Sequence, residues 1–242
     1  MMHPTPDARQ PLLLLPGLLC DHALWAHQTE QLADIAHCHV PDLTMADSVG
    51  GLAAAVLAQA PARFALAGLS MGGYVAMEIM RQAPERVARL CLVDTSARAD
   101  TDEQRQRRQA LLTLARMGRF RGMSPRLLAT QVHPDHVEVP EIGGVVLAMT
   151  ARVGRDAFCR QQSAILSRPD SRPDLPAIRV PTLVIVGAED AQTPPDRSHE
   201  IAGMIRGAAL HVIPRCGHLA PLEQPETVTG LMRDWLSLPA AP

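Results

Sequence analysis

Short apolar runs alternate with helix-like segments along this chain, and this alternation restricts its fold more than any other feature. Residues 12–15 are four consecutive leucines followed by Pro16-Gly17, a pattern typical of a short strand buried on both faces. Further strands are expected at residues 35–40, 63–68, 87–93, 182–186 and 208–213. Helices are expected at residues 25–33, 48–59, 71–82, 197–205 and 223–236. The alternation predicts an α/β fold: a mostly parallel, twisted sheet with helices on both faces.

The alternation stops between residues 97 and 179, where the sequence is helical or irregular. The clearest helix in this stretch is TDEQRQRRQALLTLARMGRF, in which Thr101 and Gln104 have the spacing of a capping box. Strand and helix patterns resume after residue 180. We therefore expect residues 1–96 and 180–242 to form one α/β core, with residues 97–179 inserted as a helical cap.

Composition excludes several kinds of function. The chain of 242 residues is 47% hydrophobic and 20% charged with a formal net charge of −2, which favours neither disorder nor electrostatic binding of nucleic acid. All 23 basic side chains are arginine, so mechanisms that require an internal lysine are excluded. A small-molecule partner is expected instead.

The cysteines and the N-terminal sequence indicate the cellular compartment in which the protein is expected. The five cysteines are odd in number and form no C-x-x-C pair, which argues against a disulfide framework and for reduced thiols. The N-terminal MMHPTPDARQP carries no basic-then-apolar signal, and no apolar run approaches the ~20 residues of a membrane span. We expect a soluble cytoplasmic protein with no membrane partner.

The segment GLSMGG places Ser70 between a predicted strand and a predicted helix. A sharp strand-to-helix turn projects the residue at the turn above the sheet, and it requires small residues two positions before and two after. Gly68 and Gly72 meet this requirement, and Gly73 allows the helix to approach the sheet closely. Ser70 is therefore predicted to be a nucleophile.

Two backbone amides are candidates to stabilise an oxyanion beside Ser70. The amide of Met71 would lie at a helix N-terminus, where unpaired N–H groups and the helix dipole favour negative charge. The loop after the first strand should supply the second donor, for which Leu18 is the candidate.

A serine hydroxyl needs a base and the base needs an orienting acid. His218 is the best placed of ten histidines, because it lies in a glycine-containing loop between the last strand and the last helix. Asp190 follows the strand TLVIV, so its carboxylate should emerge at the same sheet edge. Asp94, at the end of LCLVD, is the alternative acid, while Glu189 is expected to face solvent.

No cofactor or metal is expected. His133 and His136 in HPDH could suggest a metal ligand pair, but no third or fourth ligand accompanies them and a solvated loop explains them better. Cys20 lies near the expected site without an evident base.

Together these segments resemble the α/β-hydrolase superfamily, in which the chain order is serine, acid, histidine. The resemblance covers nearly the whole chain, from LLLLPGLL through GLSMGG and PTLVIVGAEDAQTPP to CGHLAPLEQPETV. Its pattern is most similar to small capped carboxylesterases, enol-lactonases and acyl-carrier-protein methyl ester esterases. Many relatives have His-Gly where this chain has Pro16-Gly17.

The resemblance implies hydrolysis of an ester, thioester or lactone of a small, largely apolar substrate through an acyl-enzyme on Ser70. The same triad could serve carbon–carbon bond hydrolysis, lyase or perhydrolase chemistry, and a non-catalytic binding protein on this scaffold is a further alternative. Arginines concentrate in the first part of the cap: Arg105, Arg107, Arg108, Arg116, Arg119 and Arg121. They could attract an acidic partner such as an acyl carrier protein, or a carboxylated substrate, and a solvated helix face is the alternative explanation.

The substrate pocket should be walled by aliphatic and thioether groups, since the chain has only six aromatic residues: two Trp, one Tyr and three Phe. The candidate substrate-binding residues are Leu19, Trp25, Met117, Met123 and Met149.

Overall fold

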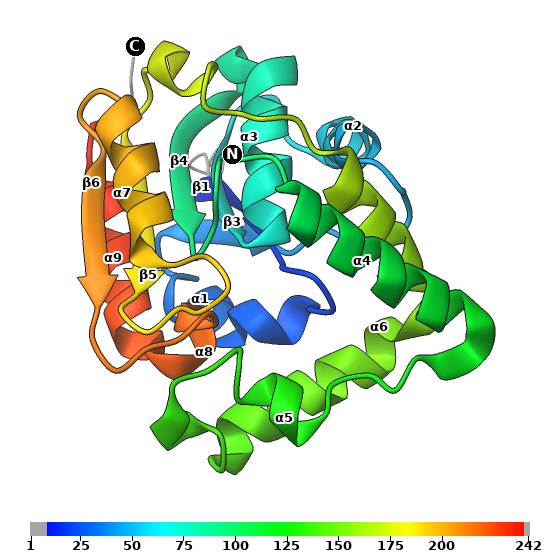
Figure 1. Ribbon diagram of the computed structural model, residues 1–242. Helices are drawn as coiled ribbons and strands as arrows, with labels where there is room; N and C mark the ends of the chain where they lie inside the picture. Colours follow the sequence, from blue (N-terminus) through cyan, green and yellow to red (C-terminus); the bar gives the residue numbers. More distant parts are fainter. Residues whose placement is uncertain (1–8, 240–242) are drawn as a thin grey trace, which may run out of the picture.

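The computed structural model describes residues 9–239, in which six parallel strands form one twisted sheet in the order β2-β1-β3-β4-β5-β6 (Figure 1). The predicted fold class is confirmed. The strands are β1 (Gln10–Leu15), β2 (Ala36–His39), β3 (Phe64–Leu69), β4 (Val87–Val93), β5 (Thr182–Gly187) and β6 (Ala209–Ile213).

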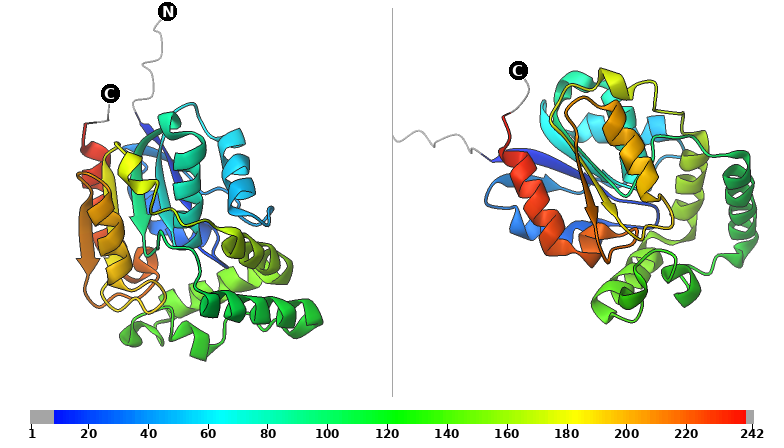
Figure 2. Two further views of the ribbon diagram at one scale, coloured as in Figure 1. Left: turned by 45° about the horizontal axis from the view of Figure 1, so that its top comes forward. Right: turned by 60° about the vertical axis from the view of Figure 1, so that its left-hand side comes forward.

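Helices cover both faces of the sheet (Figure 2). Alternate side chains of the strands enter two separate cores, because successive residues of a strand point to opposite faces: Leu66 packs on one face, and Ala65 and Ala67 on the other. The first core contains α2 (Val49–Gln59), α3 (Met71–Gln82) and α7 (Pro195–Met204). The second contains Leu24, Trp25 and Leu32, which flank α1 (Ala26–Gln31), together with side chains of α8 (Ala220–Glu223) and α9 (Pro225–Ser237).

The helices between β4 and β5 lie beside the carboxyl ends of the strands (Figure 1). They are α4 (Asp102–Leu114), the π-helical η3 (Ala115–Arg119), α5 (Pro125–Leu128) and α6 (Pro140–Ser167). The predicted capping box is present, since Thr101 accepts a hydrogen bond from the Gln104 amide and Gln104 reaches back to the Thr101 amide. Below, "the cap" means residues 97–179.

Several helices differ from their expected bounds because of proline and tight turns. The helix expected at residues 223–236 is α9 and begins at Pro225, and the non-helical Gln224 separates it from the short α8, which was not expected. The expected helix at 25–33 is shorter and is preceded by the 3-10 turn η1 (His22–Trp25). The other 3-10 turns are η2 (Pro84–Arg86), η4 (Pro134–His136) and η5 (Leu175–Ala177).

The carboxyl ends of β1, β3, β5 and β6 lie at one edge of the sheet because all the strands run in the same direction. The loops that follow these strands therefore meet beneath the cap, which places residues far apart in the sequence at one site. Within residues 9–239, no helix is both long and apolar enough to cross a membrane.

Candidate active site

Ser70 occupies a strained turn between β3 and α3. Its backbone has φ 53° and ψ −113°, in the left-handed half of conformational space that non-glycine residues rarely adopt. The flanking glycines permit this turn: a Cβ on Gly68 would lie 2.4 Å from the Gly72 carbonyl oxygen, and a Cβ on Gly72 would lie 2.2 Å from that of Leu15. The requirement for small residues around Ser70 is therefore a matter of backbone contact.

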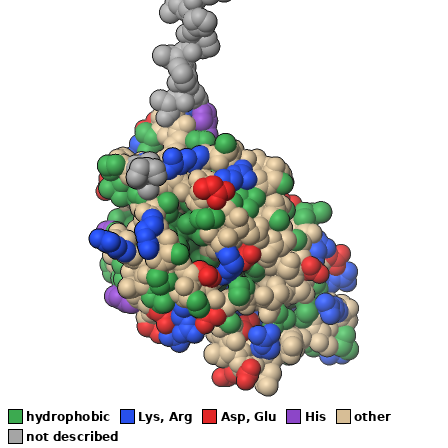
Figure 3. Space-filling view, turned by 90° about the horizontal axis from the view of Figure 1, so that it is seen from above, with side chains coloured by type: hydrophobic (Ala, Val, Ile, Leu, Met, Phe, Trp, Pro, Cys, Tyr) green, Lys and Arg blue, Asp and Glu red, His purple; other side chains and the backbone are tan. Residues whose placement is uncertain are grey.

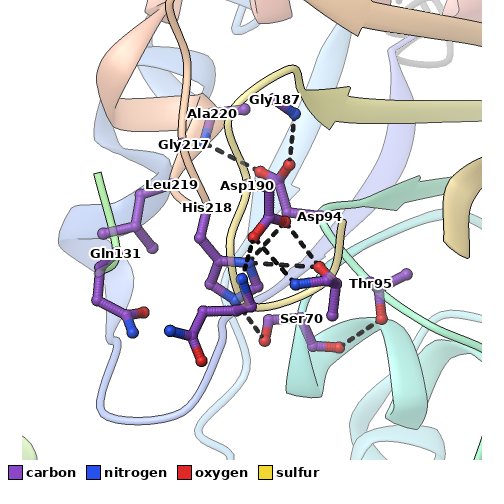
Figure 4. Close-up of polar contacts among 12 residues, drawn as sticks. Ser70, Asp94, Thr95, Gln131, Gly187, Asp190, Gly217, His218, Leu219 and Ala220 are labelled. Carbon is purple, nitrogen blue, oxygen red and sulfur yellow. Dashed lines mark hydrogen bonds and ion pairs between the residues drawn. The ribbon is translucent and has the colours of Figure 1, made fainter. Parts of the chain in front are cut away.

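Ser70, His218 and Asp190 form one hydrogen-bonded chain (Figure 4). The Ser70 Oγ and His218 Nε2 are 2.9 Å apart, and His218 Nδ1 lies 2.9 Å from Asp190 Oδ2. A carboxylate only accepts hydrogen bonds, so Nδ1 carries the proton and Nε2 is left to accept from the serine hydroxyl. The hydrogen bonds therefore run from Ser70 to His218 and from His218 to Asp190, which is the direction required for His218 to act as the general base for Ser70.

Thr193 positions the carboxylate of Asp190 through two hydrogen bonds, a role that was not predicted from the sequence. Its hydroxyl donates to Asp190 Oδ2 over 2.7 Å, and its amide donates to Oδ1 over 3.0 Å. The Gln192 amide also donates to Oδ1, over 2.8 Å. This pattern is an Asx-type turn, for which the sequence DAQT ahead of a helix was the available signal.

In the buried Asp190–His218 pair, the pKa of Asp190 is lowered and the pKa of His218 is raised, so both changes favour the carboxylate and the imidazolium. Burial by itself would raise the pKa of Asp190, but the charge and hydrogen bond of His218 and the Thr193 contacts bring it below its ordinary value. Burial would likewise lower the pKa of His218, yet the Asp190 carboxylate, with Asp94 and Glu223, raises it above 6.5. An imidazolium at this position is thus stabilised by the protein.

Asp94, the alternative acid, lies next to this pair, but its carboxylate accepts hydrogen bonds from backbone amides and not from His218. Its carboxylate accepts from the Gly187 amide over 2.9 Å and from the Ala220 amide over 3.1 Å, and the side chain is fully buried. Burial, reinforced by the charge of Asp190, raises the pKa of Asp94 to about 8. Asp94 therefore ties the end of β5 to the start of α8, and Asp190 is the carboxylate bonded to His218.

The two candidate oxyanion amides flank the serine. Met71 is the first residue of α3, and neither its amide nor that of Leu18 donates a hydrogen bond to another residue in the described part of the chain. The neighbouring Leu19 has φ 60° and donates from its amide to Gln161 Oε1 over 3.1 Å. Gln161 is a buried residue of α6 that was not predicted to belong to the site. Its side chain thus connects the cap to the loop after β1.

A cavity of about 130 Å³ lies between the sheet edge and the cap, with Ser70 and His218 in its wall. This volume is close to that of an engineered protein cavity that holds benzene. Leu18, Leu19 and Met123 also line it. Its other lining residues are Gly17, Cys20, Leu69, Tyr74, Arg108, Gln131, Val146, Thr150, Ile165, Gln192, Thr193 and Leu219.

Three of the five expected substrate-binding residues lie elsewhere. Trp25 and Met149 are fully buried in the hydrophobic core that also contains Ala65 and Ala67, and Met117 is 63% exposed. Apolar character and helical spacing do not distinguish a side chain that packs in a core from one that lines a pocket, so these residues could not be sorted from sequence. Leu19 and Met123 do line the cavity.

Glu223 accepts hydrogen bonds from the backbone on both sides of His218, a role that was not predicted from the sequence. Its buried carboxylate accepts from the Gly217 and Leu219 amides over 3.0 and 3.1 Å, on either side of His218. It also accepts from two groups of the cap, the His133 amide over 2.7 Å and His136 Nδ1 over 2.9 Å. The histidine loop and the cap are thereby joined through one side chain.

We expect Glu223→Gln to lower the free energy of unfolding by about 1–3 kcal/mol, because an amide NH₂ would replace one acceptor oxygen among several buried N–H donors. Urea denaturation of the variant and the wild type measures this difference. Glu138→Gln, an exposed residue of the same cap segment, is the matched control and should change stability by less than about 0.5 kcal/mol. Equal stability of the Glu223 variant and the control would contradict the role of this carboxylate.

Other reactive groups near the site are not arranged for catalysis. Cys20 lines the cavity, but burial, together with the charge of Asp21, raises the pKa of its thiol to about 12. Glu189 is exposed and accepts from the Cys216 amide over 3.0 Å. In residues 9–239, no group of three or more His, Cys, Asp or Glu side chains is arranged to hold a metal ion.

A parallel sheet with a serine, a histidine and an aspartate bonded in series at its carboxyl edge defines the class of α/β-fold hydrolytic enzymes. The comparison with protein families agrees, since the model of the alpha/beta hydrolase family matches residues 12–231. The chain belongs to the alpha/beta hydrolase family.

Similar proteins include esterases. A pimeloyl-[acyl-carrier protein] methyl ester esterase from Neisseria meningitidis is 28% identical, over 78% of this chain and 74% of the relative. A solved thermophilic esterase from Thermogutta terrifontis has a TM-score of 0.88 and 31% identity, over 95% of this chain and 90% of that one. An enol-lactonase from Burkholderia xenovorans shares the fold, with a TM-score of 0.85 and 23% identity over 96% and 93% of the two chains. The protein is a hydrolase of the esterase type.

Proposed function

We propose that this hydrolase cleaves a carboxylic ester, thioester or lactone through an acyl-enzyme formed on Ser70. The observation that carries the proposal is the chain of two 2.9 Å contacts from Ser70 Oγ through His218 to Asp190, beside two backbone amides with no partner among the described residues. Nucleophile, base, orienting acid and oxyanion donors are the groups that acyl transfer requires.

The arrangement supports a two-step mechanism. Ser70 Oγ attacks the carbonyl carbon as its proton passes to His218 Nε2, and the Leu18 and Met71 amides hold the oxyanion. The imidazolium, stabilised by Asp190, returns the proton to the departing alcohol, thiol or ring oxygen as the acyl-enzyme forms. Water then attacks the acyl group with His218 again as base, and the carboxylic acid leaves.

The cavity supports a substrate with an aliphatic acyl or alkyl group of modest size. Much of its wall is aliphatic or thioether: Leu18, Leu19, Leu69, Met123, Val146, Ile165 and Leu219. Such walls favour apolar groups through burial and adapt to shape through flexible side chains. Among the described residues that line the cavity, Tyr74 and the catalytic candidate His218 alone carry rings on which an aromatic substrate could stack.

An acyl carrier protein is a candidate carrier of this substrate. The Neisseria relative is named for a carrier-bound methyl ester, and Arg116, Arg119 and Arg121 of the cap are exposed. An acidic carrier could contact such arginines. Figure 3 shows that acidic side chains and arginines are interspersed over the face drawn there, with no uniform basic surface on that face.

Pre-steady-state kinetics test the acyl-enzyme directly. With p-nitrophenyl butyrate we expect a burst of about one p-nitrophenolate per active site before the steady rate, and the butyryl adduct should be trapped on Ser70 by acid quench and identified by mass spectrometry. A panel of short esters, thioesters, lactones and carrier-bound methyl esters then identifies the substrate class. Turnover of none of these, with no adduct, would contradict the proposal.

The pH dependence follows from the raised pKa of His218. The protonated imidazole cannot accept the Ser70 proton, so kcat/KM for a neutral ester should rise with pH through the pKa of His218 in the free enzyme. Because the neighbouring Asp190 raises this pKa, we expect the midpoint of the acid limb above 6.5. A kcat/KM profile between pH 4 and 9 measures it, and a midpoint below 6.5 would be inconsistent with the Asp190–His218 pair.

A further inference from the structure

Two arginines of the cap share a single carboxylate at the edge of the cavity. Arg108 Nε lies 2.9 Å from Asp100 Oδ2, and Arg168 lies 2.7 Å from Asp100 Oδ1. Asp100 is 1% exposed at its side chain and Arg168 is 6% exposed. In residues 9–239, no other carboxylate lies within ion-pair distance of either guanidinium. The cluster therefore carries a surplus of one positive charge.

This surplus charge faces the same cavity as Ser70. Arg108 lines the cavity, as does Tyr74, and the Arg168 guanidinium lies 4.4 Å from the centroid of the Tyr74 ring. Tyr74 follows Ser70 by one turn of α3, and its amide donates to the Ser70 carbonyl over 3.2 Å. Tyr74 thus lies about one helical turn, or ~5.4 Å along the axis of α3, from Ser70, and Arg168 packs on its ring while Arg108 lines the same cavity.

Arg108 retains donors for a ligand. A guanidinium has five N–H groups in a planar fork. Two contacts of Arg108 are made within the protein, from Nε to Asp100 and from one terminal nitrogen to Gln162 Oε1 over 3.2 Å. Its second terminal nitrogen donates to no residue in the described part of the chain, and the side chain is 23% exposed. Thr150, which also lines the cavity, has a buried hydroxyl with no partner among the described residues.

We propose that this end of the cavity binds a carboxylate of the substrate, so that the preferred substrates are esters carrying a second, free carboxyl group, such as the half-esters of aliphatic dicarboxylic acids. The proposal rests on the proposed ester hydrolysis and names its substrate class. A positive charge without a counter-ion is costly in a wall that is only partly hydrated, and an anion offsets that cost. Arg108 is the binding residue, while Asp100 and Arg168 position it.

The aliphatic walls fit this assignment. Leu18 and Ile165 line the cavity along with Ser70 and Arg108, so a methylene chain could run between an ester carbonyl at Ser70 and a carboxylate at Arg108. The guanidinium can hold a carboxylate by two parallel hydrogen bonds, which is the geometry for which arginine is suited. Chain length would then determine which half-ester reaches both groups.

Matched ester pairs test the anion site. Monomethyl esters of succinate through suberate are compared with the analogues in which the free carboxyl is a carboxamide of the same shape. For the best chain length we expect kcat/KM to be about 10- to 100-fold higher for the carboxylate, in line with a charge-assisted hydrogen-bonded pair. Arg108→Gln should reduce this ratio to about one, and Arg108→Lys should retain part of it. Arg107→Gln, an exposed residue one position earlier on α4, should keep the wild-type ratio.

A binding measurement separates this proposal from the hydrolytic one. Adipate and glutarate are titrated by calorimetry into the wild type, into Ser70→Ala and into Arg108→Gln, with adipamide as the neutral probe. We expect the dicarboxylates to bind the first two proteins, with at least tenfold weaker binding to Arg108→Gln and to adipamide. Folding of the Arg108 variants is checked by circular dichroism, and if Arg108→Gln does not fold, Arg108→Lys and the adipate–adipamide comparison on wild type decide.

The outcomes are distinct. Dicarboxylate binding that depends on Arg108, without turnover of any ester, would support the anion site and contradict the hydrolytic proposal. Turnover of carboxamide and carboxylate esters at equal kcat/KM, with no preference for adipate over adipamide, would overturn the anion site and leave ester hydrolysis standing.

Discussion

Replacement of Ser70 by alanine is expected to lower kcat for p-nitrophenyl butyrate by about 10⁶-fold, the loss seen when a serine nucleophile is removed from a comparable triad. His218 and Asp190 would remain, but no group in the cavity could replace the hydroxyl. Cys20 is the only thiol that lines it within the described residues, and burial raises the pKa of that thiol to about 12. Covalent labelling by a fluorophosphonate probe should disappear in the same variant.

The measurement combines steady-state kinetics with mass spectrometry of the labelled protein. Ser237→Ala, at the exposed end of α9, is the matched control and should keep both the turnover and the label. Stoichiometric labelling of Ser70→Ala, or residual turnover within tenfold of the wild type, would show that another residue is the nucleophile.

The second large effect is expected from Asp190→Asn, which should lower kcat by about 10⁴-fold, whereas Asp94→Asn should lower it by no more than about tenfold. An asparagine at position 190 could donate to His218 Nδ1 and so favour the wrong tautomer of the imidazole. Asp94 makes no hydrogen bond to His218. It accepts from the Gly187 and Ala220 amides, so its replacement should chiefly reduce stability.

The pH profile distinguishes an electrostatic role from a structural one. Burial lowers the pKa of His218 and the Asp190 carboxylate raises it, so removal of that charge should move the acid limb of residual activity to lower pH. In Asp94→Asn the limb should move less. A greater loss in the Asp94 variant, with an unchanged limb in the Asp190 variant, would make Asp94 the orienting acid.

Much of the fold was predictable because periodicity and turn chemistry are local properties of the chain. The ranges 71–82 and 87–93 coincide with α3 and β4, since each segment has a clear period and a clear stop. The tight glycines around Ser70 were predictable for the same reason. Helix bounds near Pro225 were less accurate, because a proline that starts a second helix and one that ends a helix look alike in sequence.

The candidate site was predictable in part. Ser70, His218 and both acids follow predicted strands, and parallel strands bring such residues to one edge. The long-range supporting contacts were not predictable, because Gln161 and Glu223 bond to residues as distant in sequence as Leu19 and His133, whereas the contact of Thr193 with Asp190 spans only three residues and had a local signal. The residues that line the cavity could not be predicted either, because the exposure of a helix face depends on what packs against it. Met117 was expected in the pocket but is exposed to solvent, and Met149 was expected there but is buried in the core.

The amino-acid sequence by itself determined the parallel α/β architecture, the glycine-bounded turn at Ser70 and the candidates for base and acid, since these follow from short-range pattern and chain direction. Only the tertiary structure decided that Asp190 and not Asp94 bonds to His218, which side chains line the cavity, and that Arg108 brings surplus charge to it. Those features depend on distances of a few ångströms between loops that are remote along the chain, and no local pattern encodes such distances.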